Sequence, residues 1–334
     1  MFLQGNGTIT FQPGAGETQA IADDIADQTG AGGTGAEAGS YALIKDDDGT
    51  LVLSGDNSYS GGTTVQDGTL SLQSDTAAGI GTITTTGSVI DYGNGVTIAN
   101  AIDVDSNSTQ LQVLAGTATQ SGDITETGFA RPVEKIGGGT LVLSGTNTFT
   151  GTTAITAGTL RLVNGAAVSD SSNVVIFGSS RLDLADGETV GSLTGVASST
   201  VTLNGNTLIT GASNVTTEFS GEISGSGGVT KTGAGAFTLS GTNSFTGPLT
   251  INQGFVVADG GTAIADSVSL RVNGGTFQAN DSETIGSLAA PAPSGSQAAR
   301  ASPRGLTTAR QHSPARSRTP AATAAVSSRS AMVR

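Results

Sequence analysis

Three carboxylates lie close together in the sequence, at Asp183, Asp186 and Glu188. Cleavage of a glycosidic bond uses two carboxylates about 5–10 Å apart, one as the acid and one as the base or nucleophile. Glu188 has a counterpart in Glu283, because Arg181–Leu193 and Thr276–Leu288 are copies of one local sequence. A residue copied between repeats is expected to serve the repeat. We therefore predict a structural role for this cluster, and a carbohydrate-active enzyme, a polysaccharide lyase or hydrolase, is the alternative function.

Two acidic stretches have partial calcium-loop spacing. Asp103, Asp105 and Asn107 match the opening of such a loop, but Ser108 stands where Gly is needed and Leu114 where a bidentate Glu belongs. The run Asp46-Asp47-Asp48-Gly49 is equally short of ligands. The repeated Gly-Gly-x-Gly-x-Asp pattern of calcium-binding β-rolls is absent from the sequence. Neither stretch is predicted to bind a metal.

Other site chemistry has little support in the residue types. The chain has no Cys, and its single histidine is His312, so thiolate catalysis and Cys-based zinc sites are excluded. The glycine runs 137–139 and 225–228 are not followed by the Lys-Ser/Thr of a phosphate loop, and both are expected to be turns. We predict no catalytic, cofactor-binding or metal-binding residue and no cofactor.

The charge of the chain divides at one point. Residues 1–288 hold seven basic and 27 acidic residues, a net charge of −20, whereas residues 289–334 hold seven arginines and no acid. A strongly acidic body repels nucleic acid and anionic lipid. No stretch approaches the ~18 apolar residues of a membrane helix. Nucleic acid is therefore not expected as a partner, and no membrane-spanning segment is predicted in this chain.

One sequence motif recurs three times, and these copies indicate the fold. They are Gly49–Gly61, Gly139–Gly151 and Gly235–Gly247, each beginning Gly-Thr-Leu-Val-Leu-Ser-Gly or a close variant. Apolar and polar residues alternate within each copy, as in a strand with one buried face. Leu51 to Leu70 and Leu141 to Leu160 are both 19 residues apart, so similar strands return at a regular interval. The 51 glycines disfavour helix and suit tight corners.

This pattern predicts an all-β fold, a right-handed parallel β-helix (β-solenoid) of roughly 11–14 coils with negligible helix. Leu53, Leu143 and Leu239 are expected in the core at equivalent corners. Asn57, Asn147 and Asn243 are expected to bond backbone groups at a corner, each followed by a core aromatic residue at Tyr59, Phe149 or Phe245.

The three motifs, with the continuation Thr63-Thr64-Val65 and Gly68-Thr69-Leu70, resemble the autotransporter-associated β-strand repeat of type V secreted bacterial surface proteins. The resemblance covers most of residues 5–288. It implies a structural passenger domain displayed at the outer membrane or released from it, acting as a stalk or adhesin, with repeats that assist translocation and folding. Partners implied by it are surface molecules of a host or a neighbouring cell.

The chain departs from that family's pattern at both ends. It shows neither a signal peptide nor the C-terminal membrane barrel, so we expect a passenger fragment or the product of a broken gene. After Gly286-Ser287-Leu288 the repeat gives way to a basic stretch rich in Ala, Arg, Ser and Pro. We predict domains at 1–288 (β-helical passenger repeats) and 289–334 (a disordered basic tail), with a frameshift near codon 289 as the origin of the tail.

Overall fold

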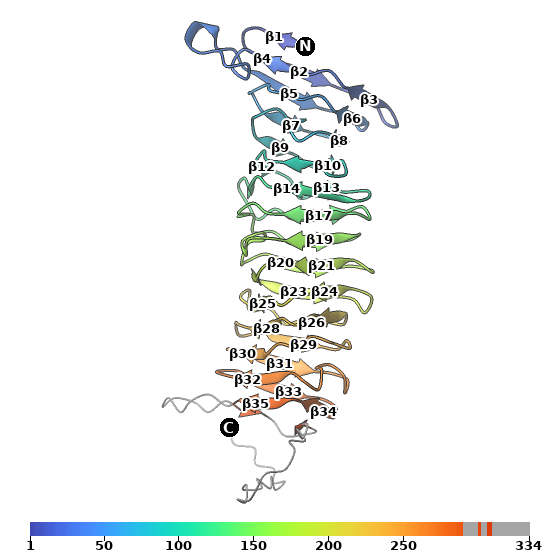
Figure 1. Cartoon of the computed structure of the whole chain (residues 1–334), viewed down its shortest axis with the longest axis vertical. Helices are drawn as coiled ribbons and strands as arrows, with labels where there is room; N and C mark the ends of the chain where they lie inside the picture. Colours follow the sequence, from blue (N-terminus) through green and yellow to red (C-terminus); the bar gives the residue numbers. More distant parts are fainter. Residues whose placement is uncertain (290–299, 302–305, 309–334) are drawn as a thin grey trace, which may run out of the picture.

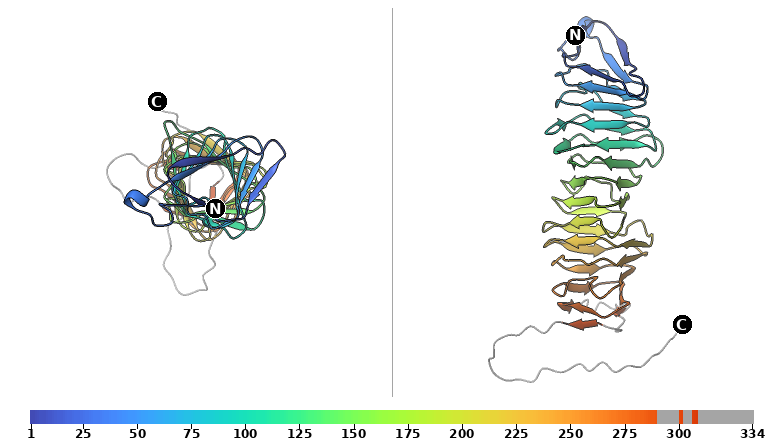
Figure 2. Two further views of the ribbon diagram at one scale, coloured as in Figure 1. Left: turned by 90° about the horizontal axis from the view of Figure 1, so that it is seen from above. Right: turned by 90° about the vertical axis from the view of Figure 1, so that its right-hand side faces the viewer.

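The computed structural model describes residues 1–289, 300–301 and 306–308. Parallel strands wind into coils that stack along one long axis, with the N-terminal coil at one end and residue 289 near the other (Figure 1). Viewed along this axis, the coils superimpose around a common centre (Figure 2). Helix in the described residues is limited to one 3-10 turn, Gly35–Glu37. The predicted all-β parallel solenoid is confirmed.

One sheet runs the whole length of the solenoid and has 14 strands, one per coil. We call it the long sheet. Its strands are β3 (Thr18–Ile21), β6 (Thr50–Leu53), β8 (Thr69–Leu72), β10 (Val89–Tyr92), β13 (Thr109–Gln112), β16 (Val133–Ile136), β18 (Thr153–Ile155), β20 (Asn173–Ile176), β23 (Ser192–Gly195), β26 (Thr217–Phe219), β29 (Ala236–Leu239), β31 (Phe255–Ala258), β33 (Thr276–Ala279) and β36 (Arg300–Ala301).

A second, seven-stranded sheet occupies the middle coils, and we call it the middle sheet. Its strands are β11 (Thr97–Ile98), β14 (Thr117–Gln120), β17 (Thr140–Leu143), β19 (Thr159–Leu162), β21 (Arg181–Leu184), β24 (Thr200–Thr202) and β27 (Glu222–Ser224).

Two six-stranded sheets and two strand pairs complete the coils. The first six-stranded sheet comprises β2 (Gly7–Phe11), β5 (Tyr41–Lys45), β7 (Thr63–Val65), β9 (Ile83–Thr85), β12 (Ile102–Val104) and β15 (Ile124–Glu126). The second comprises β22 (Glu188–Val190), β25 (Thr207–Thr210), β28 (Gly228–Lys231), β30 (Leu249–Ile251), β32 (Ser269–Val272) and β35 (Ser287–Ala289). The pairs are β1 (Phe2–Leu3) with β4 (Ala26–Asp27), and β34 (Glu283–Ile285) with β37 (Leu306–Thr308).

The core is a column of aliphatic side chains inside the coils. Leu51 pairs with Leu70 in the long sheet, and Leu141 pairs with Leu160 in the middle sheet. These four leucines are at most 1% exposed. The 19-residue spacing is therefore the length of one coil, as predicted. Gly158 makes such a short coil possible, because it has a φ of +70° and a Cβ on it would lie 2.3 Å from the carbonyl oxygen of Gly139 on the preceding coil.

The three motifs do not lie on the same side of the solenoid. Their first strands are β6 and β29 in the long sheet but β17 in the middle sheet. Four coils separate β6 from β16, and the chain then turns one corner to reach β17. Leu53, Leu143 and Leu239 are all buried, but our expectation of equivalent corners is wrong for the middle copy. The reason is that coil length varies: the step from Leu51 to Leu70 takes 19 residues, whereas Leu111 pairs with Lys135.

The predicted disordered tail and its frameshift origin fall on residues that, apart from a few, lie outside those described. The exceptions continue the stack: β35 ends at Ala289, β36 pairs with β33, and β37 pairs with β34.

Candidate functional site

A buried asparagine in each motif ties three successive coils together. The Asn147 Oδ1 accepts a hydrogen bond from the backbone N–H of Ile124 at 2.6 Å, one coil back. Its Nδ2 donates to the carbonyl oxygen of Ala167 at 2.6 Å, one coil forward. Asn147 lies where neither six-stranded sheet has a strand, so the side chain replaces a missing rung of backbone hydrogen bonds.

The other two asparagines repeat this geometry. Asn57 accepts from Ile25 N–H at 2.7 Å and donates to the Ala77 carbonyl at 2.6 Å. Asn243 accepts from Ile223 N–H at 2.8 Å and donates to the Ala263 carbonyl at 2.7 Å. The predicted corner role of these amides is confirmed.

The aromatic residue two positions after each asparagine is buried, also as predicted. Phe149 and Phe245 are 0% exposed, and Tyr59 is 1% exposed. The Tyr59 hydroxyl forms a 2.6 Å hydrogen bond with the Thr63 hydroxyl, and burial raises the pKa of this phenol. Each motif thus places a polar clamp and an apolar anchor side by side.

Sequence reasoning missed a buried lysine that precedes each motif by four residues. Lys45, Lys135 and Lys231 each stand six residues before the first core residue of the motif strand, and all are at most 1% exposed. Lys135 Nζ donates to the carbonyl oxygens of Ile136, Gly137 and Ala157, at 2.8, 2.8 and 3.1 Å. The constant offset from Leu51, Leu141 and Phe237 was the available signal.

Each ammonium group donates hydrogen bonds to backbone carbonyl oxygens of the corner that follows the lysine in the sequence. Lys45 Nζ donates to the carbonyls of Asp46, Asp47 and Asp67, and Lys231 Nζ to those of Thr232 and Gly233. Charge-assisted hydrogen bonds of this kind offset the cost of removing a charge from water. Burial still disfavours the charged form and lowers the pKa of Lys135 to about 8.

The duplicated glutamates continue the asparagine rungs. Glu188 accepts from the backbone N–H groups of Ala167 and Val168, both at 3.4 Å, and Glu283 Oε1 accepts from Ile264 N–H at 2.9 Å. A continuous ladder of hydrogen bonds therefore runs along one side of the solenoid from β15 to β22. Its members, in order, are Ile124, Asn147, Ala167 and Glu188. The predicted structural role of Glu188 fits this position. Burial raises the pKa of Glu188 to about 7.

This pKa predicts a pH-dependent stability. An unfolded chain releases the Glu188 proton near pH 4.3, while the folded chain keeps it to about pH 7. The contribution of the protonated Glu188 side chain to the free energy of unfolding is thus full below pH 4.3 and is lost as the pH rises through 7. The total change is on the order of 3 kcal/mol. We expect Glu188→Gln to flatten the change in unfolding free energy over this window in urea titrations. The exposed Glu222→Gln is the control and retains the slope of the unchanged chain; an equal slope in the Glu188 variant would contradict the prediction.

The three carboxylates considered for glycoside cleavage do not converge. Glu188 points into the solenoid, whereas Asp183 lies on the outer face of β21. Asp186 is exposed and accepts a hydrogen bond from the Asn164 backbone N–H at 3.0 Å. These three carboxylates therefore do not place an acid and a base at one substrate position.

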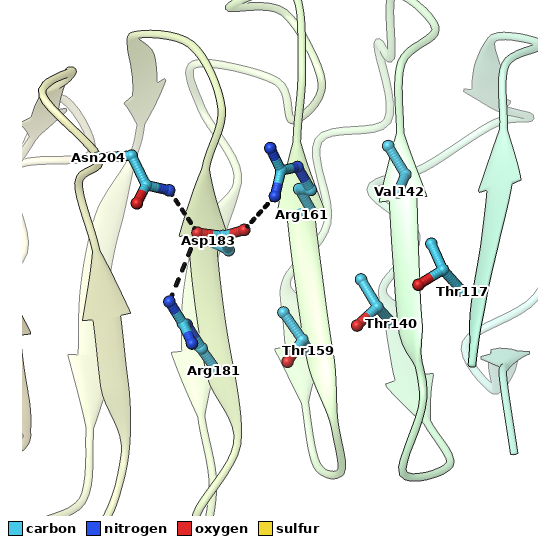
Figure 3. Close-up of a pocket in the computed structure, with 8 residues that line it drawn as sticks. All are labelled: Thr117, Thr140, Val142, Thr159, Arg161, Arg181, Asp183 and Asn204. Carbon is cyan, nitrogen blue, oxygen red and sulfur yellow. Dashed lines mark hydrogen bonds and ion pairs between the residues drawn. The ribbon is translucent and has the colours of Figure 1, made fainter. Parts of the chain in front are cut away.

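Asp183 is instead the centre of an arginine cluster. Its Oδ2 lies 2.9 Å from Arg161 Nη1, its Oδ1 lies 3.8 Å from Arg181 Nη2, and Asn204 Nδ2 donates to Oδ1 at 2.6 Å. Figure 3 shows the two arginines on either side of this carboxylate. They line an open groove on the outer face of the middle sheet, which we call the Arg161–Arg181 groove, together with Thr117, Thr140, Val142, Thr159, Asp183 and Asn204.

The partial calcium loops have other partners. Arg131 binds Asp105 at 3.1 Å and Asn107 at 3.2 Å, and the carboxylate of Asp103 accepts from the Thr127 hydroxyl. Asp46 accepts from Gln12 at 2.9 Å. The glycine runs lie at bends between strands, with Gly137 and Gly225 at φ values of +78° and +106°, and Gly228 at the end of the second run is the first residue of β28.

Comparison with known proteins agrees with this repeat architecture. Residues 43–72, 133–162 and 229–258 match the passenger-associated-transport-repeat. Each matched segment contains one buried lysine, one clamp asparagine and one aromatic anchor. The chain therefore carries three copies of the autotransporter passenger repeat, and this implies a location at the cell surface or outside the cell.

Among individual proteins, the chain is similar to the adhesin BmaC autotransporter of Brucella suis biovar 1 (strain 1330). The two are 35% identical over an alignment of 287 residues, and the match covers 75% of this chain and 8% of the relative. The chain thus spans a small part of the curated relative that it matches. No solved structure matches the chain. Within the described residues, no helix is long and apolar enough to cross a membrane.

Proposed function

We propose that this chain is a non-enzymatic stalk segment of a surface adhesin, whose partners are surface molecules of a host or a neighbouring cell. The observation that carries the proposal is the use of the repeated polar residues. Lysine, asparagine and glutamate side chains in the repeats bond backbone groups of adjacent coils and so serve the stacking. A long stack of coils is suited to holding a binding surface away from a membrane. The −20 charge of residues 1–288 favours partners other than nucleic acid.

Display is tested on the source bacterium. An antibody raised against the full chain is expected to label intact cells, and protease added outside the cells is expected to remove the label. Deletion of the coding sequence is the control for the antibody and should also lower adherence of the cells. Labelling that requires permeabilised cells would contradict the proposal.

The enzyme alternative is tested on the purified chain. We expect no release of reducing ends or unsaturated products from neutral or acidic polysaccharides, because Asp183 and Glu188 face opposite sides of the coil wall. A polysaccharide lyase of known activity serves as the positive control. Turnover that is abolished by Asp183→Asn or Glu188→Gln would overturn the non-enzymatic assignment.

A further inference from the structure

Within residues 1–289, two of the three arginines whose side chains are exposed lie together on one face of the solenoid. Of the seven basic residues before position 289, the three lysines are buried in their carbonyl cradles and Arg131 is bound to Asp105. Arg161 and Arg181 remain, side by side in the Arg161–Arg181 groove, each with a side chain 45% exposed. Arg271 is a separate exposed arginine on β32.

Asp183 fixes the two arginines without neutralising them. The Asp183 side chain is only 9% exposed and lies 2.9 Å from Arg161 Nη1 and 3.8 Å from Arg181 Nη2, while each arginine side chain is 45% exposed. One carboxylate against two guanidinium groups leaves one net positive charge. Asn204 adds a third bond to Asp183 and holds the carboxylate in position. A guanidinium fork that is held in this way presents paired donors to a ligand carboxylate.

The surrounding face of the middle sheet is rich in hydroxyl groups. Thr117, Thr140 and Thr159 stand in register on β14, β17 and β19 and form a row that leads to Arg181 (Figure 3). Apart from Asp183, no outward-facing position of β14, β17, β19 or β21 carries an acid. Threonine hydroxyls both donate and accept hydrogen bonds, as sugar hydroxyls do.

We propose that the Arg161–Arg181 groove binds a glycan that carries a carboxylated sugar, with the carboxylate on the two arginines and neutral sugar units along the threonine row. The row follows the solenoid axis with one hydroxyl about every 4.8 Å, the spacing of adjacent strands, which suits a linear chain of sugar units. A single carboxylate matches the single net charge of the groove. A densely charged polymer would instead be repelled by the acidic body around it.

This assignment deepens the proposed function by naming a ligand class, but it is tested on the purified full chain and does not depend on display. The probe is a galacto-oligosaccharide whose neutral units end in one glucuronic acid, and it therefore carries a single negative charge. Its matched control is the same oligosaccharide with the carboxylate reduced to an alcohol. Titration calorimetry should show binding of the acidic probe and roughly tenfold or more weaker binding of the reduced one, because hydrogen bonds to charged groups contribute about 1.5–3 kcal/mol.

Variants locate the binding. Arg161→Ala and Arg181→Ala are each expected to weaken binding of the acidic probe by about tenfold or more, whereas Arg271→Ala, exposed on another sheet, leaves it unchanged. Arg161→Lys keeps the charge but loses the fork, and an intermediate affinity is expected. Unchanged thermal midpoints show that the variants are folded.

Several outcomes overturn the proposal. These are equal affinity for the acidic and the reduced probe, an equal loss in Arg271→Ala, tighter binding of dextran sulfate than of the probe, or equal binding of a glutamate-containing peptide. Failure of surface labelling with intact glycan binding would refute the display proposal alone. The reverse result would refute only the ligand assignment.

Discussion

Leu143→Ala is expected to lower the free energy of unfolding of its own coils by about 2–5 kcal/mol. Leu143 is 1% exposed and stacks between Gln120 and Leu162 in the middle sheet. Truncation leaves a cavity that the flanking coils cannot fill, because their backbones are tied at the strand spacing. Native-state hydrogen exchange measures the effect, which should be largest in the coils of β14, β17 and β19 and fade in distant coils.

The neighbouring Val142 provides the matched control. It has the same backbone environment on β17 but points outward and is partly exposed. Val142→Ala should change the same amide protection by well under the Leu143 effect, about 0.5 kcal/mol or less. Equal effects of the two substitutions would show that the inward assignment of Leu143 is wrong.

Asn147→Ala is expected to destabilise the solenoid by about 2–5 kcal/mol, since two backbone groups lose their partner at once. The N–H of Ile124 and the carbonyl of Ala167 are both bonded to this side chain, and both sites are buried. A buried polar group without a partner costs about 1–3 kcal/mol. Urea unfolding of the full chain, combined with hydrogen exchange at Ile124, measures the loss.

Two comparisons make this prediction specific. Thr146→Ala changes an exposed neighbour and should be close to neutral. Asn57→Ala removes the same clamp four coils away, so its effect should add to that of Asn147→Ala, because distant sites in a repeat protein act independently. A neutral Asn147→Ala would mean that the amide is not a structural clamp.

The buried lysines also link the backbone within and between coils. Each ammonium draws together carbonyl oxygens from the corner that follows it and, at Lys45 and Lys135, from the next coil. Because the folded-state pKa of Lys135 is lowered to about 8, the cost of burying this charge declines as the pH rises above 8.

The sequence alone determined the architecture and the inward residues of this protein. A parallel solenoid follows from the 19-residue return of Leu51 to Leu70, and the roles of Asn147 and Phe149 follow from their exact recurrence. These features are local, because a residue and the neighbour on which it stacks lie only one coil apart in the sequence. A repeated pattern therefore carries enough information to place them.

Only the tertiary structure shows which side of the solenoid each strand occupies and which side chains of adjacent coils meet. The sequence spacing does not state that β17 lies on a different side from β6, because that depends on the summed lengths of four unequal coils. The cradle of Lys135 also needed the structure, since two of its carbonyls follow it in sequence but the third, from Ala157, comes from the next coil. The Arg161–Arg181 groove arises in the same way: its arginines are 20 residues apart and meet at Asp183 only because one coil places β21 beside β19.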